Sequence, residues 1–209
     1  MATIADFAID PKTNFQMDYS SIIVPTDQSV CYANLVGRLL DGKKHVLAVG
    51  PTGTGKTVTV SQKLSQGLSD SFEPIMMAFS AQTSANQTQD ILDGKFEKRR
   101  QGRDKDTGLD FTMWGPMLGK QFVIFVDDFN MPKRETYGAQ PPLELMRQMV
   151  DHGGWYDRKT LRWKKIVDVV LVGAMGPPGG GRRPVTNRML RLMHCVSFVD
   201  MYHATTQTP

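Results

Sequence analysis

The sequence predicts an α/β fold in three layers, with helices on both faces of a parallel five-stranded sheet. Short apolar stretches alternate with amphipathic ones along the 209 residues, as expected for strands joined by crossover helices. The first apolar stretch runs directly into a glycine-rich turn at residues 50–57, and the third ends in Asp127 and Asp128. Polar groups at the carboxyl ends of parallel strands are typical of ligand sites in such sheets.

The length suits one domain with flanks, and a domain of this size buries roughly 70% of the surface of its unfolded chain. Residues 1–22 are polar and irregular, which indicates a linker or flank. The domain itself is expected over residues 23–200, and residues 201–209 are expected to form a truncated C-terminal flank.

The first half of the domain is expected to contain three helices and two strands. Apolar residues recur every three to four positions over residues 27–40, which predicts a helix. A short apolar run predicts a buried strand at 45–49, and a helix-compatible stretch follows at 56–67. A second strand is predicted at 75–79, and a further helix over roughly 84–98.

The second half contains three more strand candidates. These short apolar stretches lie at residues 122–126, 168–173 and 195–199. A helix is predicted over 141–151, since proline suits a first helical turn and an apolar stripe follows it. Residues 153–167 are expected to form a turn and hairpin, and the glycine-rich residues 176–181 a loop.

The glycine-rich turn has the P-loop pattern Gly-Pro-Thr-Gly-Thr-Gly-Lys-Thr, between a strand and a helix. Its glycines allow backbone N–H groups to close around phosphates, and the helix N-terminus adds a favourable dipole. The predicted residues for binding ATP or ADP are Gly50, Pro51, Thr52, Gly53, Thr54, Gly55, Lys56 and Thr57. A glycine-rich turn without a ligand is the alternative, which the position directly after a strand disfavours.

The two aspartates at the end of strand 122–126 are candidates for metal binding and catalysis. In P-loop NTPases such a carboxylate and the P-loop hydroxyl hold Mg²⁺, which assigns Asp127 and Thr57 to the metal. Asp128 stands where AAA+ ATPases usually carry a glutamate that polarises the attacking water. Its shorter side chain misplaces the oxygen by over ~1 Å, which can cost on the order of a hundredfold in rate. A strand-terminal turn is the structural alternative.

Two further positions bear on hydrolysis. AAA+ ATPases place a polar sensor residue after the fourth strand, where this chain has Met175 or Gly176, neither of which can orient water. Arg188 and Arg191, three residues apart on one predicted helix face, are candidates to reach the γ-phosphate of a neighbouring subunit. An ordinary basic helix end is an equally good interpretation of either arginine alone.

Composition limits the partners. The net charge is +4, and the basic residues between 95 and 105 are interrupted by acids and lack interleaved aromatics. A solvated helix end and loop is therefore favoured there over a polyanion contact, and no nucleic-acid partner is expected. No stretch approaches ~18 apolar residues, so no membrane partner is expected either. Cys31 and Cys195 are expected to be reduced thiols in or near the core.

Several longer strings resemble the third AAA+ module of axonemal dynein heavy chains. These are residues 23–26, 50–57, 125–132, 137–144, 153–157 and 174–182. The resemblance covers nearly the whole chain, and several of the strings are far more specific than a bare P-loop. It implies the large α/β subdomain of an AAA+ P-loop NTPase, without the helical lid that follows in the family, since the chain stops about ten residues after its last predicted strand.

The resemblance also implies a function. The family's third module binds ATP or ADP with Mg²⁺ in a regulatory role, with slow or no hydrolysis, inside a microtubule motor of the ciliary or flagellar axoneme. Val24 and Pro25 match the segment that flanks the adenine pocket, and Arg188 or Arg191 would face the nucleotide of the preceding module. The implied partners are neighbouring AAA+ modules and, through a full-length heavy chain, intermediate chains, light chains and microtubules.

Two other functions remain open. The chain could be a self-assembling ATPase that hydrolyses ATP through Asp128 with an arginine from its neighbour; the missing sensor side chain disfavours this. It could instead be a structural fragment that binds little nucleotide, which the intact Lys56, Thr57 and Asp127 disfavour.

Overall fold

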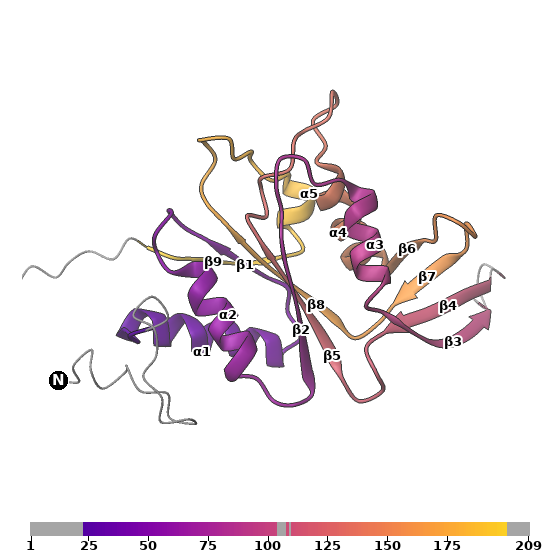
Figure 1. The fold of residues 1–209 in the computed structure, drawn as a ribbon, viewed down its shortest axis with the longest axis horizontal. Helices are drawn as coiled ribbons and strands as arrows, with labels where there is room; N and C mark the ends of the chain where they lie inside the picture. Colours follow the sequence, from indigo (N-terminus) through magenta and orange to yellow (C-terminus); the bar gives the residue numbers. More distant parts are fainter. Residues whose placement is uncertain (1–22, 104–107, 109, 200–209) are drawn as a thin grey trace, which may run out of the picture.

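The computed structural model describes residues 23–103, 108 and 110–199 of the chain (Figure 1). The two predicted flanks, residues 1–22 and 201–209, lie outside the described residues.

The main sheet has five strands in the order β2-β5-β8-β1-β9, and all its pairings are parallel. The strands are β1 (Val46–Val49), β2 (Phe72–Ala78), β5 (Gln121–Asp127), β8 (Val169–Met175) and β9 (His194–Ser197). Each coincides, within a few residues, with a predicted apolar stretch. The predicted parallel five-stranded sheet is therefore confirmed, and β8 lies between β1 and β5 at its centre.

Helices cover both faces of this sheet (Figure 1). On one face lie α1 (Asp27–Asp41) and α2 (Lys56–Gln66); on the other lie α3 (Ala85–Asp93), α4 (Pro141–His152) and the short α5 (Asn187–Leu190). Side chains of β5 alternate between the two layers: Val123 and Phe125 pack towards α1 and α2, whereas Ile124 packs towards α3 and α4. This alternation explains why the strand reads as one continuous apolar run.

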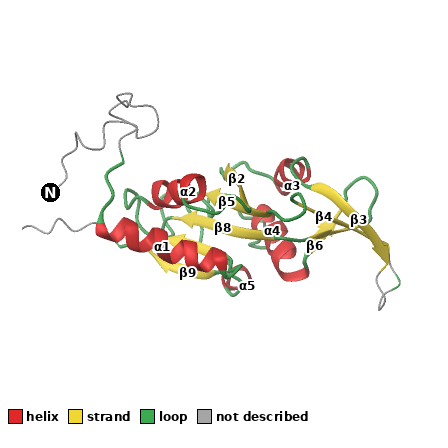
Figure 2. Ribbon diagram, turned by 90° about the horizontal axis from the view of Figure 1, so that it is seen from below, coloured by secondary structure: helices red, strands yellow, loops and turns green. Residues whose placement is uncertain are grey.

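A second sheet, absent from the sequence prediction, extends one end of the molecule away from α1 and α2 (Figure 2). Its order is β3-β4-β7-β6, with strands β3 (Glu97–Arg103), β4 (Asp110–Gly115), β6 (Gly154–Tyr156) and β7 (Trp163–Ile166). The antiparallel β6–β7 pair confirms the predicted hairpin.

The predicted helix over roughly 84–98 is confirmed as far as Asp93 and is wrong over residues 94–98. Helix α3 ends at Asp93, where Gly94 donates its backbone N–H to the carbonyl oxygens of Asp90 and Leu92. The chain then enters β3, because this basic segment pairs with β4, with a register shift at Arg99. The expected solvated helix end and loop is thus an edge strand, in which Arg99 forms an ion pair with Asp168 at 2.5 Å.

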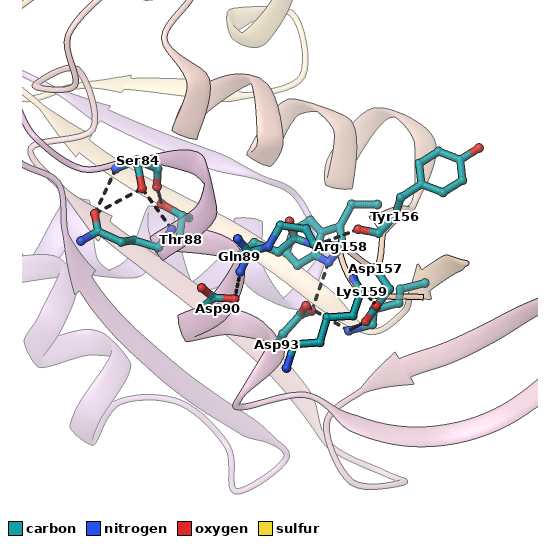
Figure 3. A network of polar contacts seen from close by, with 12 residues as sticks. Ser84, Thr88, Gln89, Asp90, Asp93, Tyr156, Asp157, Arg158 and Lys159 are labelled. Carbon is teal, nitrogen blue, oxygen red and sulfur yellow. Dashed lines mark hydrogen bonds and ion pairs between the residues drawn. The ribbon is translucent and has the colours of Figure 1, made fainter. Parts of the chain in front are cut away.

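A polar network joins α3 to the second sheet (Figure 3). Lys164 Nζ lies 3.0 Å from a carboxylate oxygen of Asp93 and 2.7 Å from one of Asp157. Trp155 Nε1 donates to the second oxygen of Asp93, at 3.1 Å. Gln89 Nε2 donates to the carbonyl oxygen of Tyr156, at 2.8 Å. Lys164 is only 9% exposed, so these two carboxylates compensate the cost of burying its positive charge.

Candidate nucleotide site

The P-loop connects β1 to α2 and has the backbone that phosphate binding requires. Gly53 and Gly55 have φ angles of 88° and 72°, in the left-handed region that favours glycine. A Cβ on Gly50 would lie 2.3 Å from the carbonyl oxygen of Phe198, so this position also requires glycine. Helix α2 begins at Gly55 without a side-chain cap, which leaves its first backbone N–H groups available to an anion.

Lys56 lies folded against the P-loop at the start of α2. Its Nζ donates to the carbonyl oxygen of Pro51 at 2.6 Å and to the Thr54 hydroxyl at 3.3 Å. Burial and, after it, the positive charge of Arg182 lower the pKa of the Lys56 ammonium, against the opposing effect of Asp127 and Asp128. An anionic ligand beside Lys56 and Arg182 would offset their mutual repulsion.

Thr57 and Asp127 meet as predicted for a magnesium site. The Thr57 hydroxyl donates to Asp127 Oδ1 at 3.1 Å across 70 residues of sequence, and the backbone N–H of Asp128 donates to the same oxygen at 2.9 Å. Both side chains offer the oxygen ligands that Mg²⁺ prefers, and they lie one hydrogen-bond length apart. The two residues therefore fit the metal that usually accompanies a bound nucleotide.

Asp128 lies in a strained turn directly after β5. Its φ is 49°, which is uncommon for a residue other than glycine. Its carbonyl oxygen accepts from the backbone N–H of Met131 at 2.9 Å, so a backbone turn follows β5 directly. The side chain is 45% exposed, and its Oδ1 lies 3.4 Å from Arg182 Nη2. The structure thus combines the turn with a carboxylate that faces the site.

The two predicted catalytic arginines lie elsewhere. Helix α5 ends at Leu190, and Arg191 is its C-terminal cap, with helical backbone angles and an N–H that donates to the carbonyl oxygen of Asn187. Arg191 donates to Asp151 of α4 at 2.5 Å, whereas Arg188 is exposed on α5. An action of either residue on a neighbouring subunit stays a prediction.

Other predicted positions are also placed by the structure. Val24 and Pro25 lie exposed in the segment before α1, and their contact with adenine stays a prediction. The expectation of buried thiols is wrong: Cys31 and Cys195 are both exposed, on α1 and on the edge strand β9. Every helix in the described part of the chain is too short or too polar to cross a bilayer.

Sequence reasoning missed three residues that shape the site. Asn130 is fully buried, and its amide donates to the carbonyl oxygen of Gly176 at 2.9 Å. Gln140, also buried, donates to the carbonyl oxygen of Pro132 at 2.7 Å. Arg182 extends from the glycine-rich loop to Asp128. Only Arg182 carried a signal: it is the first charged residue after the predicted glycine-rich loop 176–181, which follows the sensor position.

The fold and the site together define a class of protein. A P-loop follows an interior strand of a five-stranded parallel sheet, and the acidic end of β5 contacts the P-loop threonine. This is a P-loop NTPase fold of the AAA type, and its site is one for a nucleotide.

Comparison with known proteins identifies the family. A family described as the P-loop containing dynein motor region matches residues 11–201. The chain is 50% identical to human dynein axonemal heavy chain 1 over 202 residues, which is 96% of this chain and 4% of the relative. It is 46% identical to mouse dynein axonemal heavy chain 3 over 178 residues, 85% of this chain and 4% of the relative. The chain therefore belongs to the dynein motor region family, as an AAA region of the axonemal heavy-chain type, and spans a small part of its relatives' length.

Proposed function

We propose that this chain is the large α/β subdomain of the third AAA+ module of an axonemal dynein heavy chain, and that it binds ATP or ADP with Mg²⁺ as a regulatory site. The position in the ring rests on the strings at residues 125–132 and 174–182, which resemble the third module. Neighbouring AAA+ modules of the same heavy chain would be its direct partners. Intermediate chains, light chains and microtubules would be reached through the full-length motor in the ciliary or flagellar axoneme.

Slow or absent hydrolysis is supported by the surroundings of Asp128. The carboxylate is on a side chain shorter than glutamate, lies at a φ of 49°, and is 3.4 Å from a competing guanidinium. The sensor position carries Gly176, which has no polar side chain. Because a displacement of ~1 Å can cost on the order of a hundredfold in rate, the site favours binding over turnover.

Titration of ATP and ADP into the 209-residue chain, with and without Mg²⁺, tests this proposal. We expect both nucleotides to bind, ATP more tightly with Mg²⁺, and single-turnover hydrolysis to be negligible. Turnover that rises steeply with protein concentration would favour a self-assembling ATPase, in which the exposed Arg188 acts on a neighbour. Absence of any binding would refute a nucleotide site in this chain.

Asp128→Glu is expected to raise single-turnover hydrolysis, by about 10- to 100-fold if carboxylate position is the main defect. Hydrolysis is measured with limiting ATP and excess protein, and nucleotide affinity is measured in parallel. Asp128→Asn is the matched control, since it keeps the shorter length and removes the charge; no increase is expected. An unchanged rate in Asp128→Glu would indicate that the missing sensor side chain at Gly176 limits hydrolysis instead.

A further inference from the structure

The side chain of Arg182 fills the space beside Gly176. A Cβ built on Gly176 would lie 2.9 Å from Arg182 Nε, 3.0 Å from its Cδ and 3.2 Å from its Cζ. Gly176 directly follows β8, the strand that pairs with both β1 and β5. The guanidinium therefore lies where a sensor side chain would project, at the edge of the sheet that carries the P-loop and Asp128.

The backbone of Arg182 is held firmly in this place. Its N–H and carbonyl oxygen exchange hydrogen bonds with Gly179 at 3.0 and 3.1 Å. The next residue, Arg183, donates its N–H to the carbonyl oxygen of Asn130 at 3.1 Å, and the Asn130 amide donates to Gly176. The turn requires glycines, because residues 179–181 all have positive φ. Arg182 is thus a positioned group rather than a freely moving surface side chain.

The Arg182 guanidinium has N–H donors that lack a close acceptor. Its Nε is buried and has no hydrogen-bond partner among the described residues, and its Nη2 reaches Asp128 Oδ1 only at 3.4 Å. Nε and Nη2 form one edge of the guanidinium, the kind of edge that binds two oxygens of a phosphate or carboxylate at once. A partly buried cation with an unused donor beside a P-loop is suited to an additional anionic acceptor.

We propose that Arg182 binds the γ-phosphate of a nucleotide in the same chain, in place of the sensor side chain that Gly176 lacks, and so lets the site distinguish ATP from ADP. The γ-phosphate would compete with Asp128 for the guanidinium and supply an acceptor for Nε. Hydrogen bonds already connect Arg182 to the P-loop: Arg182 Nη2 reaches Asp128, whose backbone N–H donates to the same Asp127 oxygen that accepts from the Thr57 hydroxyl. The inference rests on the proposed nucleotide site.

The test compares a non-hydrolysable ATP analogue with ADP, each titrated with Mg²⁺ into wild type and variants. Arg182→Ala should weaken binding of the ATP analogue by about 10- to 100-fold, the loss typical of a hydrogen bond to a charged group. ADP affinity should change by less than about threefold, because ADP lacks the phosphate that Arg182 contacts. Arg183→Ala is the matched control: this exposed neighbour should change neither affinity.

Gly176→Ala tests the same contact without removal of the arginine. The three heavy atoms nearest to the added methyl group would all belong to the Arg182 side chain, so we expect the backbone to be kept and the guanidinium to be displaced. A selective loss of affinity for the ATP analogue, with ADP affinity retained, is expected here too. If a variant weakened binding of both nucleotides equally, or if neither variant changed any affinity, the proposed role of Arg182 would be overturned. Binding of ADP to wild type would in that case still support the nucleotide site itself. Wild type that bound neither nucleotide would overturn both.

Discussion

Lys56→Ala is expected to weaken binding of both ATP and ADP by about 30-fold or more. The removal of one member of a desolvated, hydrogen-bonded charge pair typically costs ~2–5 kcal/mol, and the phosphates would lose their direct ammonium. The remaining P-loop N–H groups and Thr57 would not replace this charge. The measurement is calorimetric or fluorescence titration of both nucleotides with Mg²⁺.

The fold should survive this substitution. Lys56 donates only to Pro51 and Thr54 of its own loop, and its burial beside Arg182 disfavours the charged form. The unfolding midpoint of Lys56→Ala should therefore stay close to that of wild type. Lys63→Ala, two turns further along α2, is the matched control and should bind nucleotide normally. Equal affinities in wild type and Lys56→Ala would rule out phosphate binding at the P-loop.

Lys164→Met is expected to have the largest effect on stability, a loss of about 3 kcal/mol at neutral pH. The change leaves the carboxylates of Asp93 and Asp157 without their shared cation, and the loss of one partner from a buried ion pair typically costs ~3–5 kcal/mol. The two carboxylates retain about a fifth of their exposure, which favours the lower end of that range. Urea unfolding at several pH values measures the effect.

The pH dependence separates this network from simple packing. The hydrogen bond from Lys164 lowers the pKa of Asp157 in the folded state. The ionised Asp157 therefore stabilises the fold fully above its unfolded pKa of about 4, and this stabilisation is lost as the pH falls further. Burial opposes the charge of Lys164, but its hydrogen bonds to Asp157 and Asp93 outweigh this and raise its pKa. The difference between wild type and Lys164→Met should therefore shrink below about pH 4.

Lys165→Met is the matched control for this experiment. The side chain of Lys165 is exposed, and its Nζ lies 5.4 Å from the centre of the Phe111 ring, a contact worth less than ~1 kcal/mol. Only a small, nearly pH-independent change is expected. If Lys164→Met were as stable as wild type at neutral pH, the network would contribute nothing to the attachment of the second sheet.

The sequence predicted the main sheet well because its signals are local. The three central strands β1, β5 and β8 are largely buried and read as short apolar runs, and the P-loop combines a strand, glycines and a helix start within a few residues. The Thr57–Asp127 contact also followed, because Thr57 lies in the first turn of the helix after β1 and Asp127 ends β5, and the carboxyl ends of parallel strands meet at one edge of a sheet.

The second sheet could not be predicted in the same way. Strand β3 is composed of charged and polar residues, because it is an edge strand whose stability comes from backbone pairing with β4 rather than from burial of its own side chains. Strand β4 in turn pairs with β7, some fifty residues further along the chain. Such non-local pairing leaves little trace in a short window of sequence. The helix predicted after Ser84 was therefore extended beyond the observed end of α3 at Asp93.

The sequence by itself determined the α/β class, the phosphate-binding loop and the pair of acidic residues, since each depends on neighbours in the chain. Only the tertiary structure showed that Arg182 faces Asp128, whereas the action of Arg188 or Arg191 on a neighbouring subunit stays a prediction. Arg188 and Arg191 were favoured for their position before the last strand, yet Arg191 pairs with α4, while Arg182 reaches Asp128 across 54 residues. That choice depends on a glycine turn and on the space left by Gly176, because side-chain direction is set by the contacts of the folded chain.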